Sequence, residues 1–326
     1  MFAKLQRLGL GGIPLQGGSP ESTKTLIEKM AEDGYFLIDS AKVYGVSEAW
    51  IGVAVKDRRS QVFLASKSMA RDYRQMRADI ADSLEKFQTD YIDLYQCHNI
   101  ANEKDYQTVM GEGGAYQALL EAQAAGQIKH IGVSSHSVAF MAEKLDEMPF
   151  VSLQIPFNII EEEGRQLLRR AKEKGLLTIA MKPLCGGVIA DRALALRFFN
   201  NDPVVDIVLA GMAELKEYLA NKEALNGEFT TDDEAQATSL KAELGQNFCR
   251  RCGYCLPCPV AINIPMVWVC ELYDKRYGLK QWAKSRYNSL AVKADQCIGC
   301  GNCEASCPYQ LKIIDKMHEM ATFFKD

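Results

Sequence analysis

The chain has 326 residues, of which 48% are hydrophobic and 25% are charged, and its formal net charge at pH 7 is −4. This composition excludes disorder as the main state, and the lack of a basic excess argues against a nucleic-acid-binding protein. The apolar run Ile264–Cys270 is too short for a membrane span, and the N-terminus has no apolar stretch of signal-peptide length. We therefore expect a cytoplasmic protein with no nucleic-acid or membrane partner.

Eight short apolar runs recur along the first two thirds of the chain. Each is four or five residues long with few alternating polar positions, a pattern typical of parallel strands that are buried on both faces. The runs are Leu8–Gly12, Tyr35–Asp39, Val62–Ser66, Ile92–Gln96, Lys129–Val133, Val151–Gln154, Leu177–Met181 and Asp206–Ala210.

Amphipathic segments separate these runs and predict the helices between the strands. Two of the segments end at a glycine, Gly34 or Gly175, as helices often do. The segments are Glu21–Glu32, Arg74–Phe87, Ala115–Ala125, Val138–Leu145, Glu163–Lys174 and Leu215–Ala224. Eight strands alternating with helices predict an α/β fold, a (β/α)8 TIM barrel over residues 1–226, with an open doubly wound sheet as the alternative.

The chain changes character after the last predicted strand. Residues 227–246 are polar and predict a linker with a short helix, which leaves residues 247–326 as a second, smaller domain. Nine of the eleven cysteines lie between Cys249 and Cys307. In a secreted miniprotein such a density of cysteines indicates disulfides. In a reducing compartment it favours thiolates that hold a metal centre.

Polar side chains stand at the ends of three consecutive predicted strands. Asp39 ends the second run, Tyr44 follows in its loop, Lys67 follows the third run, and His98 lies just after the fourth. Singly, each has an ordinary explanation as a helix cap, a solvated lysine or a structural histidine, and Lys67 could form a Schiff base as in aldolase-type barrels. Because the strands of a barrel end at one mouth, together they predict an active site there.

These residues occur in an order that resembles the aldo/keto reductase family, over about residues 1–225. The resemblance implies a barrel that binds NAD(P)H without a Rossmann fold and a catalytic tetrad of Asp39, Tyr44, Lys67 and His98. The matching segments are Leu8-Gly-Leu-Gly, Asp39-Ser-Ala-Lys-Val-Tyr-Gly-Val-Ser-Glu48, Lys67, His98 and Ile131-Gly-Val-Ser-Ser.

The chemistry of that tetrad follows from its side chains. Reducing a carbonyl needs a hydride at carbon, which the nicotinamide supplies, and a proton at oxygen. Tyr44 would be the proton donor if the Lys67 ammonium lowers its pKa from the ordinary value of about 10. Asp39 would keep Lys67 charged and oriented, while His98 would hydrogen-bond to the substrate oxygen.

The resemblance also implies a set of nucleotide-binding residues. Ser134 and Gln154 would hydrogen-bond to the nicotinamide carboxamide, and Asn221 stands where the family has an adenine-contacting Asn. Loops after the seventh and eighth strands carry phosphate sites in many barrels, although their glycines also suit ordinary turns. The remaining expected contacts are Asn158, Met181, Pro183, Leu184, Gly186, Gly187, Gly211 and Met212.

Two positions depart from the family pattern. Met181 replaces the aromatic residue that stacks on the nicotinamide, and a thioether is a looser platform than a ring. Glu217 stands near the position where a basic group binds the 2′-phosphate of NADPH. Unless Lys216 or Lys222 reaches that phosphate, the negative charge predicts that NADH binds at least as well as NADPH.

The cysteine-rich segment contains two similar runs. Residues 297–307 form the full C-x2-C-x2-C-x3-C run before a proline that is typical of bacterial ferredoxins, whereas residues 249–258 are one residue short before the fourth cysteine. Zinc is the alternative ligand of such pairs. Helices expected over Met266–Tyr277 and Gln281–Tyr287 make the segment resemble the α-helical type of two-cluster ferredoxin, and the chain resembles the iron–sulfur branch of the aldo/keto reductases.

In two-cluster ferredoxins the fourth cysteine of a run binds the other cluster. This predicts two [4Fe–4S] clusters, or one if the shorter run is degenerate. The expected ligand sets are Cys249, Cys252, Cys255 and Cys307 for one cluster, and Cys297, Cys300, Cys303 and Cys258 for the other.

The sequence therefore predicts an oxidoreductase that transfers hydride between NAD(P)H and a carbonyl or alcohol, with the clusters relaying electrons. A small-molecule substrate is expected, and a redox partner protein is a further expectation. Two alternatives remain: an electron-transfer protein in which the clusters are the main functional centre, and an enzyme whose clusters only stabilise the C-terminal segment.

Overall fold

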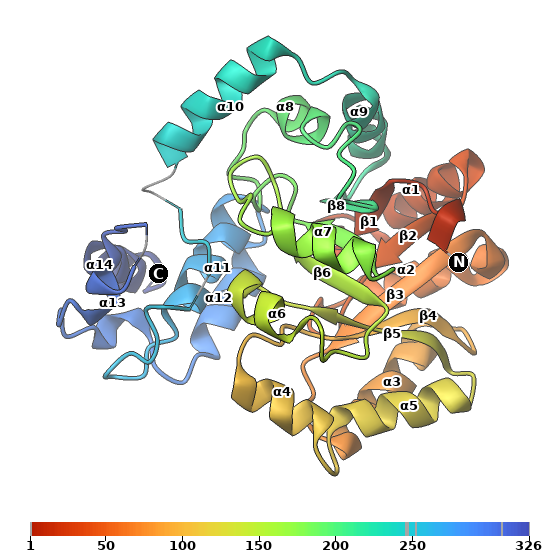
Figure 1. The fold of residues 1–326 in the computed structure, drawn as a ribbon, viewed down its shortest axis with the longest axis horizontal. Coiled ribbons are helices and arrows are strands. Elements are labelled where there is room, and N and C mark those ends of the chain that lie inside the picture. Colours follow the sequence, from red (N-terminus) through yellow and green to blue (C-terminus); the bar gives the residue numbers. More distant parts are fainter. Residues whose placement is uncertain (1, 245–247, 252, 308, 326) are drawn as a thin grey trace. The chain divides into compact units, whose positions relative to one another are not determined.

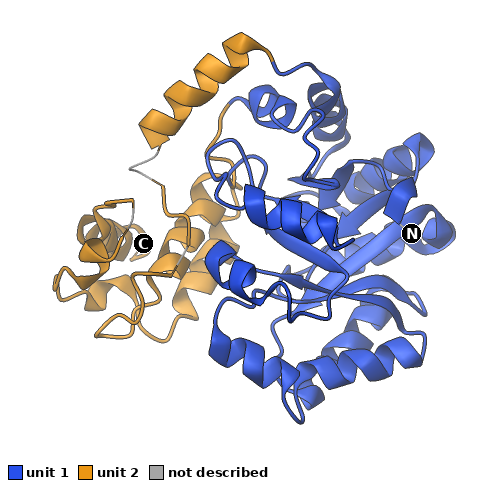
Figure 2. Ribbon diagram, in the orientation of Figure 1, with its two compact units in different colours: residues 1–185, 191–229 blue, residues 186–190, 230–326 orange. Residues whose placement is uncertain are grey.

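The computed structural model describes residues 2–244, 248–251, 253–307 and 309–325. The predicted start of the second domain, residue 247, lies outside these ranges. The chain forms two compact units: residues 1–185 and 191–229 make up the first, and residues 186–190 and 230–326 the second (Figure 2).

In the described part of the first unit, eight parallel strands form a closed barrel, each paired with the next and β8 paired with β1 (Figure 1). The predicted TIM barrel is therefore confirmed, and the open sheet is excluded. The strands are β1 (Leu8–Gly11), β2 (Phe36–Asp39), β3 (Val62–Ser68), β4 (Ile92–Cys97), β5 (Ile128–Ser134), β6 (Ser152–Pro156), β7 (Leu177–Met181) and β8 (Ile207–Gly211).

Helices follow the strands and cover the barrel. Several begin at a capping side chain: Ser19 accepts a hydrogen bond from the Ser22 amide, and Asp72 accepts one from the Gln75 amide. The helices are α1 (Pro20–Asp33), α2 (Ser47–Val55), α3 (Tyr73–Phe87), α4 (Glu103–Met110), α5 (Ala115–Ala124), α6 (Val138–Lys144), α7 (Arg165–Glu173), α8 (Arg192–Arg197) and α9 (Leu215–Asn226).

Alternate strand positions face two different cores. Leu37, Phe63 and Leu94 belong to a cluster inside the barrel, whereas Ile38 and Leu64 pack outward under the helices. Because both faces of the strands are buried, the strand sequences are continuous apolar runs. The polar residues at the carboxyl ends of these strands are therefore exceptions to the apolar pattern, and their function is considered below.

Helix α2 lies unusually close to α3. A Cβ atom at Gly52, in the middle of α2, would lie 2.2 Å from the carbonyl oxygen of Lys86, near the end of α3. Only glycine permits this approach without displacement of one backbone. The close approach sets the position of α2, which carries Glu48 in its first turn.

The described part of the second unit is mainly helical, as predicted, and has its own apolar core. Tyr287 stacks on Phe324 with ring centroids 4.2 Å apart, and Val267, Ala283 and Met320 are buried beside them. The helices are α10 (Thr231–Leu244), α11 (Ile264–Lys275), α12 (Lys280–Asn288), α13 (Asn302–Ala305) and α14 (Ile313–Phe323). Helix α10 occupies most of the predicted linker. None of the described helices of the chain is long and apolar enough to cross a membrane.

Candidate functional site

The four predicted catalytic side chains lie at one mouth of the barrel. Asp39 is the last residue of β2, Lys67 lies in β3, His98 follows β4, and Tyr44 is in the loop before α2. The Tyr44 and His98 rings meet edge to face with centroids 6.1 Å apart. The Lys67 ammonium nitrogen lies 4.9 Å from the centroid of the Tyr44 ring. The structure thus brings a phenol, an imidazole and an ammonium group together.

Lys67 and Asp39 form a buried ion pair beneath Tyr44. Their exposed fractions are 1% and 2%, and Lys67 donates hydrogen bonds to the Asp39 carboxylate and, at 2.7 Å, to the Ser40 carbonyl oxygen. Burial lowers the pKa of Lys67, an effect that the Asp39 carboxylate opposes. Burial likewise raises the pKa of Asp39 against the influence of Lys67. Each charge is therefore kept in the barrel by the other.

Two glutamines extend this pair across the barrel. The Gln96 amide nitrogen donates to Asp39 Oδ1 at 3.2 Å and to Gln154 Oε1 at 3.0 Å, and Gln154 Nε2 donates to Asp39 Oδ2 at 3.5 Å. Sequence reasoning assigned Gln154 to the nicotinamide but gave Gln96 no role. The sequence feature that could have identified Gln96 is its position as a polar residue at the end of an apolar strand.

Glu48 is a second buried carboxylate behind Lys67. It accepts hydrogen bonds from Ser66 Oγ at 2.6 Å and Ser83 Oγ at 2.8 Å, and from Lys42 Nζ at 3.3 Å. These contacts join α2 to β3 and α3. The charge of Glu48 also favours the protonated form of Lys67.

The expected nicotinamide contacts surround the same mouth but differ in how they are held. Ser134, at the end of β5, accepts a hydrogen bond from the Asn99 amide at 3.1 Å. Met181 ends β7, with its sulfur 4.0 Å from Gln154 Nε2. The Asn158 side chain is already engaged, because it donates to Glu161 Oε2 at 2.9 Å and accepts from two backbone amides. In this structure Asn158 fixes the loop after β6.

Several non-glycine residues in the loops at the mouth have positive φ angles, which such residues rarely adopt. Asn99, Lys182 and Cys185 have φ angles of 55°, 59° and 52°. Such left-handed residues persist only where their surroundings hold them, and they concentrate at functional sites. Pro183 and Leu184, predicted to contact the nucleotide, lie between the last two of these residues.

The predicted phosphate-loop glycines fall into two groups. Gly186 and Gly187 have φ angles of 70° and 85° and belong by their contacts to the second unit, where the Leu272 and Arg276 side chains lie over them. Gly211 ends β8 in the first unit, and Met212 after it is fully buried.

The start of α9 has a different charge pattern from the one that the sequence indicated. Glu217 accepts hydrogen bonds from the Ala213 amide at 2.7 Å and from Arg192 Nη2 at 3.2 Å. Arg192 also lies 3.5 Å from the Oδ1 atom of Asn221, a fully buried residue whose Nδ2 atom has no hydrogen-bond partner in the described part of the chain. The carboxylate of Glu217 is thus used to cap its own helix and is offset by an arginine that sequence reasoning missed.

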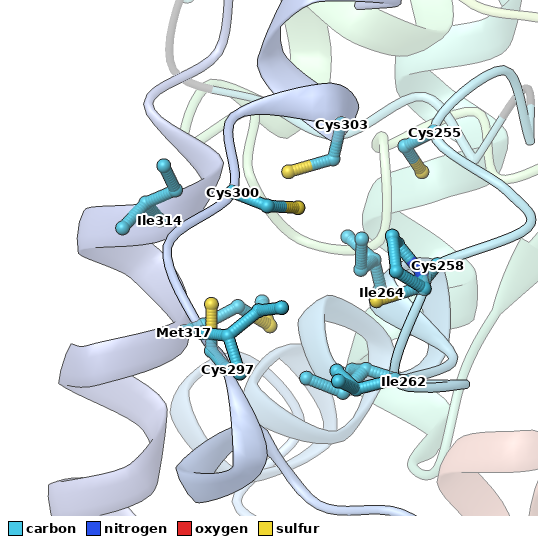
Figure 3. A pocket seen from close by; sticks show the side chains of 12 residues that line it. Cys255, Cys258, Ile262, Ile264, Cys297, Cys300, Cys303, Ile314 and Met317 are labelled. Carbon is cyan, nitrogen blue, oxygen red and sulfur yellow. The ribbon is translucent and has the colours of Figure 1, made fainter.

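The described cysteines of the two runs line two separate hollows in the second unit. Figure 3 shows one of them, where Cys258, Cys297, Cys300 and Cys303 surround a space together with Cys255. The other hollow is lined by Cys249, Cys255 and Cys307. Cys252, the remaining expected ligand, lies outside the described residues.

The donor set of these hollows fits iron–sulfur clusters. Cys258, Cys297, Cys300 and Cys303 line one hollow together with Cys255, and the other described residues of its lining are apolar. Four thiolates around an apolar space are what a [4Fe–4S] cluster needs. Gly253, Gly299 and Gly301 all have positive φ angles, which lets the backbone curve around the hollows.

Comparison with known proteins agrees with this division. Residues 7–193 match the family described as Aldo/keto reductase family. The chain belongs to the aldo/keto reductase family. Residues 248–312 match a second family, described as 4Fe-4S dicluster domain. This aldo/keto reductase therefore carries a 4Fe–4S domain after its barrel.

Curated relatives cover only part of the chain. Aldo-keto reductase YhdN from Bacillus subtilis is 32% identical over 217 residues, which are 60% of this chain and 63% of that protein. Methylglyoxal reductase DkgA from Escherichia coli is 34% identical over 146 residues, 44% of this chain and 50% of that protein. The chain thus spans less than two thirds of the length of these relatives.

Among solved structures, an aldo-keto reductase from Klebsiella pneumoniae in complex with NADPH has a TM-score of 0.61 at 20% identity, over 73% of this chain and 91% of that one. The holo form of an aldo-keto reductase from Bacillus halodurans has a TM-score of 0.60 at 23% identity, over 72% and 92%. At these identities the likeness establishes the barrel fold.

Proposed function

We propose that this aldo/keto reductase transfers hydride between NAD(P)H and a small carbonyl or alcohol at the barrel mouth. The observation that carries the proposal is the stack of groups there: the Tyr44 and His98 rings meet over the buried Lys67–Asp39 pair. A phenol next to a buried ammonium group is suited to give and regain a proton. The family match supports the same reaction class.

The side chains divide the work as follows. When bound, the nicotinamide would supply the hydride. Tyr44 donates a proton to the carbonyl oxygen, and the Lys67 ammonium stabilises the phenolate that remains. Asp39, held by Gln96 and Gln154, keeps Lys67 charged and in place. His98 hydrogen-bonds to the substrate oxygen and fixes its direction of approach.

We propose small dicarbonyls as the first substrates to try, because two relatives are named for such compounds: methylglyoxal reductase DkgA and a glyoxal reductase from Bacillus subtilis, the second 29% identical over 213 residues. An anaerobic assay with methylglyoxal, glyoxal and a panel of aldehydes, ketones and alcohols tests the proposal with either nucleotide. Turnover that depends on Tyr44 supports it. Absence of turnover across the panel, in protein that binds nucleotide, contradicts it.

The choice of nucleotide rests on Arg192 and Glu217. The sequence predicts that NADH binds at least as well as NADPH, because Glu217 stands near the 2′-phosphate, unless Lys216 or Lys222 reaches that phosphate. The Arg192 guanidinium lies 3.2 Å from Glu217, so a positive charge is available beside the negative one. We therefore propose that Arg192 lets the site accept NADPH, while Ser134 and Gln154 bind the nicotinamide of either cofactor.

We propose that the second unit holds two [4Fe–4S] clusters, one on each set of cysteines. The expected sets are Cys249, Cys252, Cys255 with Cys307, and Cys297, Cys300, Cys303 with Cys258. The lining of the hollows supports these sets, although Cys255 lines both hollows and Cys252 lies outside the described residues. Such clusters supply one-electron chemistry, which also favours a reducing, cytoplasmic location. Anaerobic iron and sulfide analysis should give about eight of each per chain. About four would indicate a single cluster.

An electron-transfer role is the second candidate, and the 4Fe–4S domain match favours it. In that case the nucleotide would reduce the clusters, which would in turn reduce a protein partner. Absorbance of the clusters during NADPH or NADH addition distinguishes the roles. Bleaching without carbonyl reduction supports electron transfer, whereas carbonyl reduction with unchanged cluster spectra supports clusters that only stabilise the unit.

A further inference from the structure

The two hollows of the second unit differ in charge. We infer that they hold clusters of unequal reduction potential, and that Arg250 and Arg251 make the cluster on Cys249 the easier one to reduce. This inference rests on the proposed pair of clusters and goes beyond it, because it assigns an order of reduction to the two cysteine sets.

Two guanidinium groups line the hollow of Cys249. The central carbon of the Arg250 guanidinium lies 3.9 Å from the centroid of the Tyr309 ring. Arg251 is only 9% exposed, donates a hydrogen bond to the Cys249 carbonyl oxygen at 3.1 Å and lies 5.3 Å from the centroid of Phe248. Aromatic and backbone contacts therefore hold both positive charges beside this hollow.

The hollow of Cys258 and Cys297 has no charged residue among its described lining. Its walls are apolar side chains, of which Figure 3 shows Ile262, Ile264 and Met317. Lys293 and Asp295, on the segment before Cys297, have opposite charges and are not among the described lining residues of this hollow.

The side chain that follows Cys303 is negatively charged. Glu304 follows Cys303 directly and accepts a hydrogen bond from the Ile314 amide at 2.8 Å, which holds its carboxylate next to the cysteine loop. Its charge disfavours further negative charge in this hollow. The difference in charge between the surroundings of the two hollows is therefore larger.

Reduction of a [4Fe–4S] cluster adds one electron and therefore one negative charge to a group that four thiolates already make anionic. A neighbouring guanidinium stabilises the added charge, and a carboxylate or an apolar wall disfavours it. The cluster beside Arg250 and Arg251 should accept the first electron from a reductant, and the cluster beside Glu304 the second.

The test is a redox titration of the intact, anaerobically purified chain with dithionite as the electron donor, followed by electron paramagnetic resonance. Two separate one-electron steps are expected. Arg250→Gln should lower the potential of the first step and leave the second nearly unchanged, whereas Arg250→Lys, which keeps the charge, should restore it. Lys280→Gln is the matched control, since Lys280 is exposed and lines neither hollow.

A complementary variant tests the other hollow. Ile298 lines it and is 65% exposed, so a lysine there remains solvated and does not disturb the core. Ile298→Lys should raise the potential of the second step and bring the two steps closer together.

The inference is overturned if both clusters of the unaltered chain are reduced in one step. It is also overturned if Arg250→Gln shifts the titration no more than Lys280→Gln, or if Ile298→Lys leaves the second step unmoved. Iron content separates these results from a failure of the proposed function. About eight iron atoms per chain, together with equal potentials of the two clusters, would contradict only the inferred difference in potential. About four iron atoms per chain would contradict the proposed pair of clusters.

Discussion

At the barrel mouth, Asp39, Lys67, Gln96 and Gln154 hydrogen-bond to one another from four strands and are nearly inaccessible to solvent. The described cysteines of the two runs in the second unit instead lie on loops, apart from Cys303 in the short helix α13, and most of them pack against that unit's apolar core. The first site keeps its geometry through its own hydrogen bonds. The second is an arrangement of thiols around spaces, and we expect it to depend on the clusters that fill them.

The largest expected effect concerns the two populations of thiols. After iron is removed by chelation, iodoacetamide should label the cysteines of the two runs in the second unit rapidly, while Cys97 in β4 stays unlabelled. Burial raises the pKa of Cys97 to about 12, so at pH 8 only about one thiol in 10⁴ would be a reactive thiolate. Cys300, by contrast, is exposed.

Mass spectrometry of the labelled peptides checks this, with untreated protein as the control. We expect Cys300 to react at least about 10³ times faster than Cys97 in the iron-free protein. Similar rates for the two would show that the barrel also loses its structure when iron is lost, and the contrast between the two regions would fail.

Tyr44→Phe should lower carbonyl reduction by about 10²-fold or more, because the phenolic proton is lost while the hydrogen-bonded groups beneath it remain. Nucleotide binding should be unchanged. Tyr73→Phe is the matched control, since that hydroxyl donates to Glu121 on the exposed surface of the barrel. Near-normal turnover by the Tyr44 variant would remove the basis for the proposed reductase.

Arg192→Ala should reduce the preference for NADPH over NADH about tenfold, because Glu217 would then meet the 2′-phosphate alone. Glu217→Gln should move the preference in the opposite direction. Fluorescence titration of both nucleotides against each variant measures the ratio. An unchanged ratio in both variants would place the 2′-phosphate away from this pair of charges.

The smallest effect is expected at Met181. Met181→Tyr should tighten nucleotide binding about threefold if the side chain covers the nicotinamide, since a ring stacks better than a thioether. Met181→Leu keeps the size without a ring and should bind slightly more weakly than the native chain. Weaker binding by the Tyr variant than by the Leu variant would show that the mouth has no room for the ring.

Most of the barrel could be predicted because its strands are buried on both faces and therefore have a distinctive sequence pattern. The predicted strand ends lie within three residues of the observed ones, although β3 runs on to include Lys67. Helix α2 was not predicted, because its Ser47 and Glu48 are buried and leave no regular polar face.

The parts of the site that escaped prediction depend on contacts between distant segments. Gln96 gains its role only when β2 and β6 bring Asp39 and Gln154 to it. Arg192 offsets Glu217 only because the helices after β7 and β8 lie side by side. Spacing alone identified the cysteines, but the unequal charge of their surroundings appears only when the chain is folded.

Gly52 shows how a substitution far from the chemistry could imitate the loss of a catalytic group. Even alanine at this position would collide with the backbone of α3 and push α2 outward. Because Glu48 begins that helix, its bonds to Ser66 and Ser83 would loosen, and Lys67 would lose a nearby negative charge. In a mutational scan for loss of activity, substitutions of this glycine would look like substitutions of an active-site residue. The scan alone would therefore assign Gly52 wrongly to the active site.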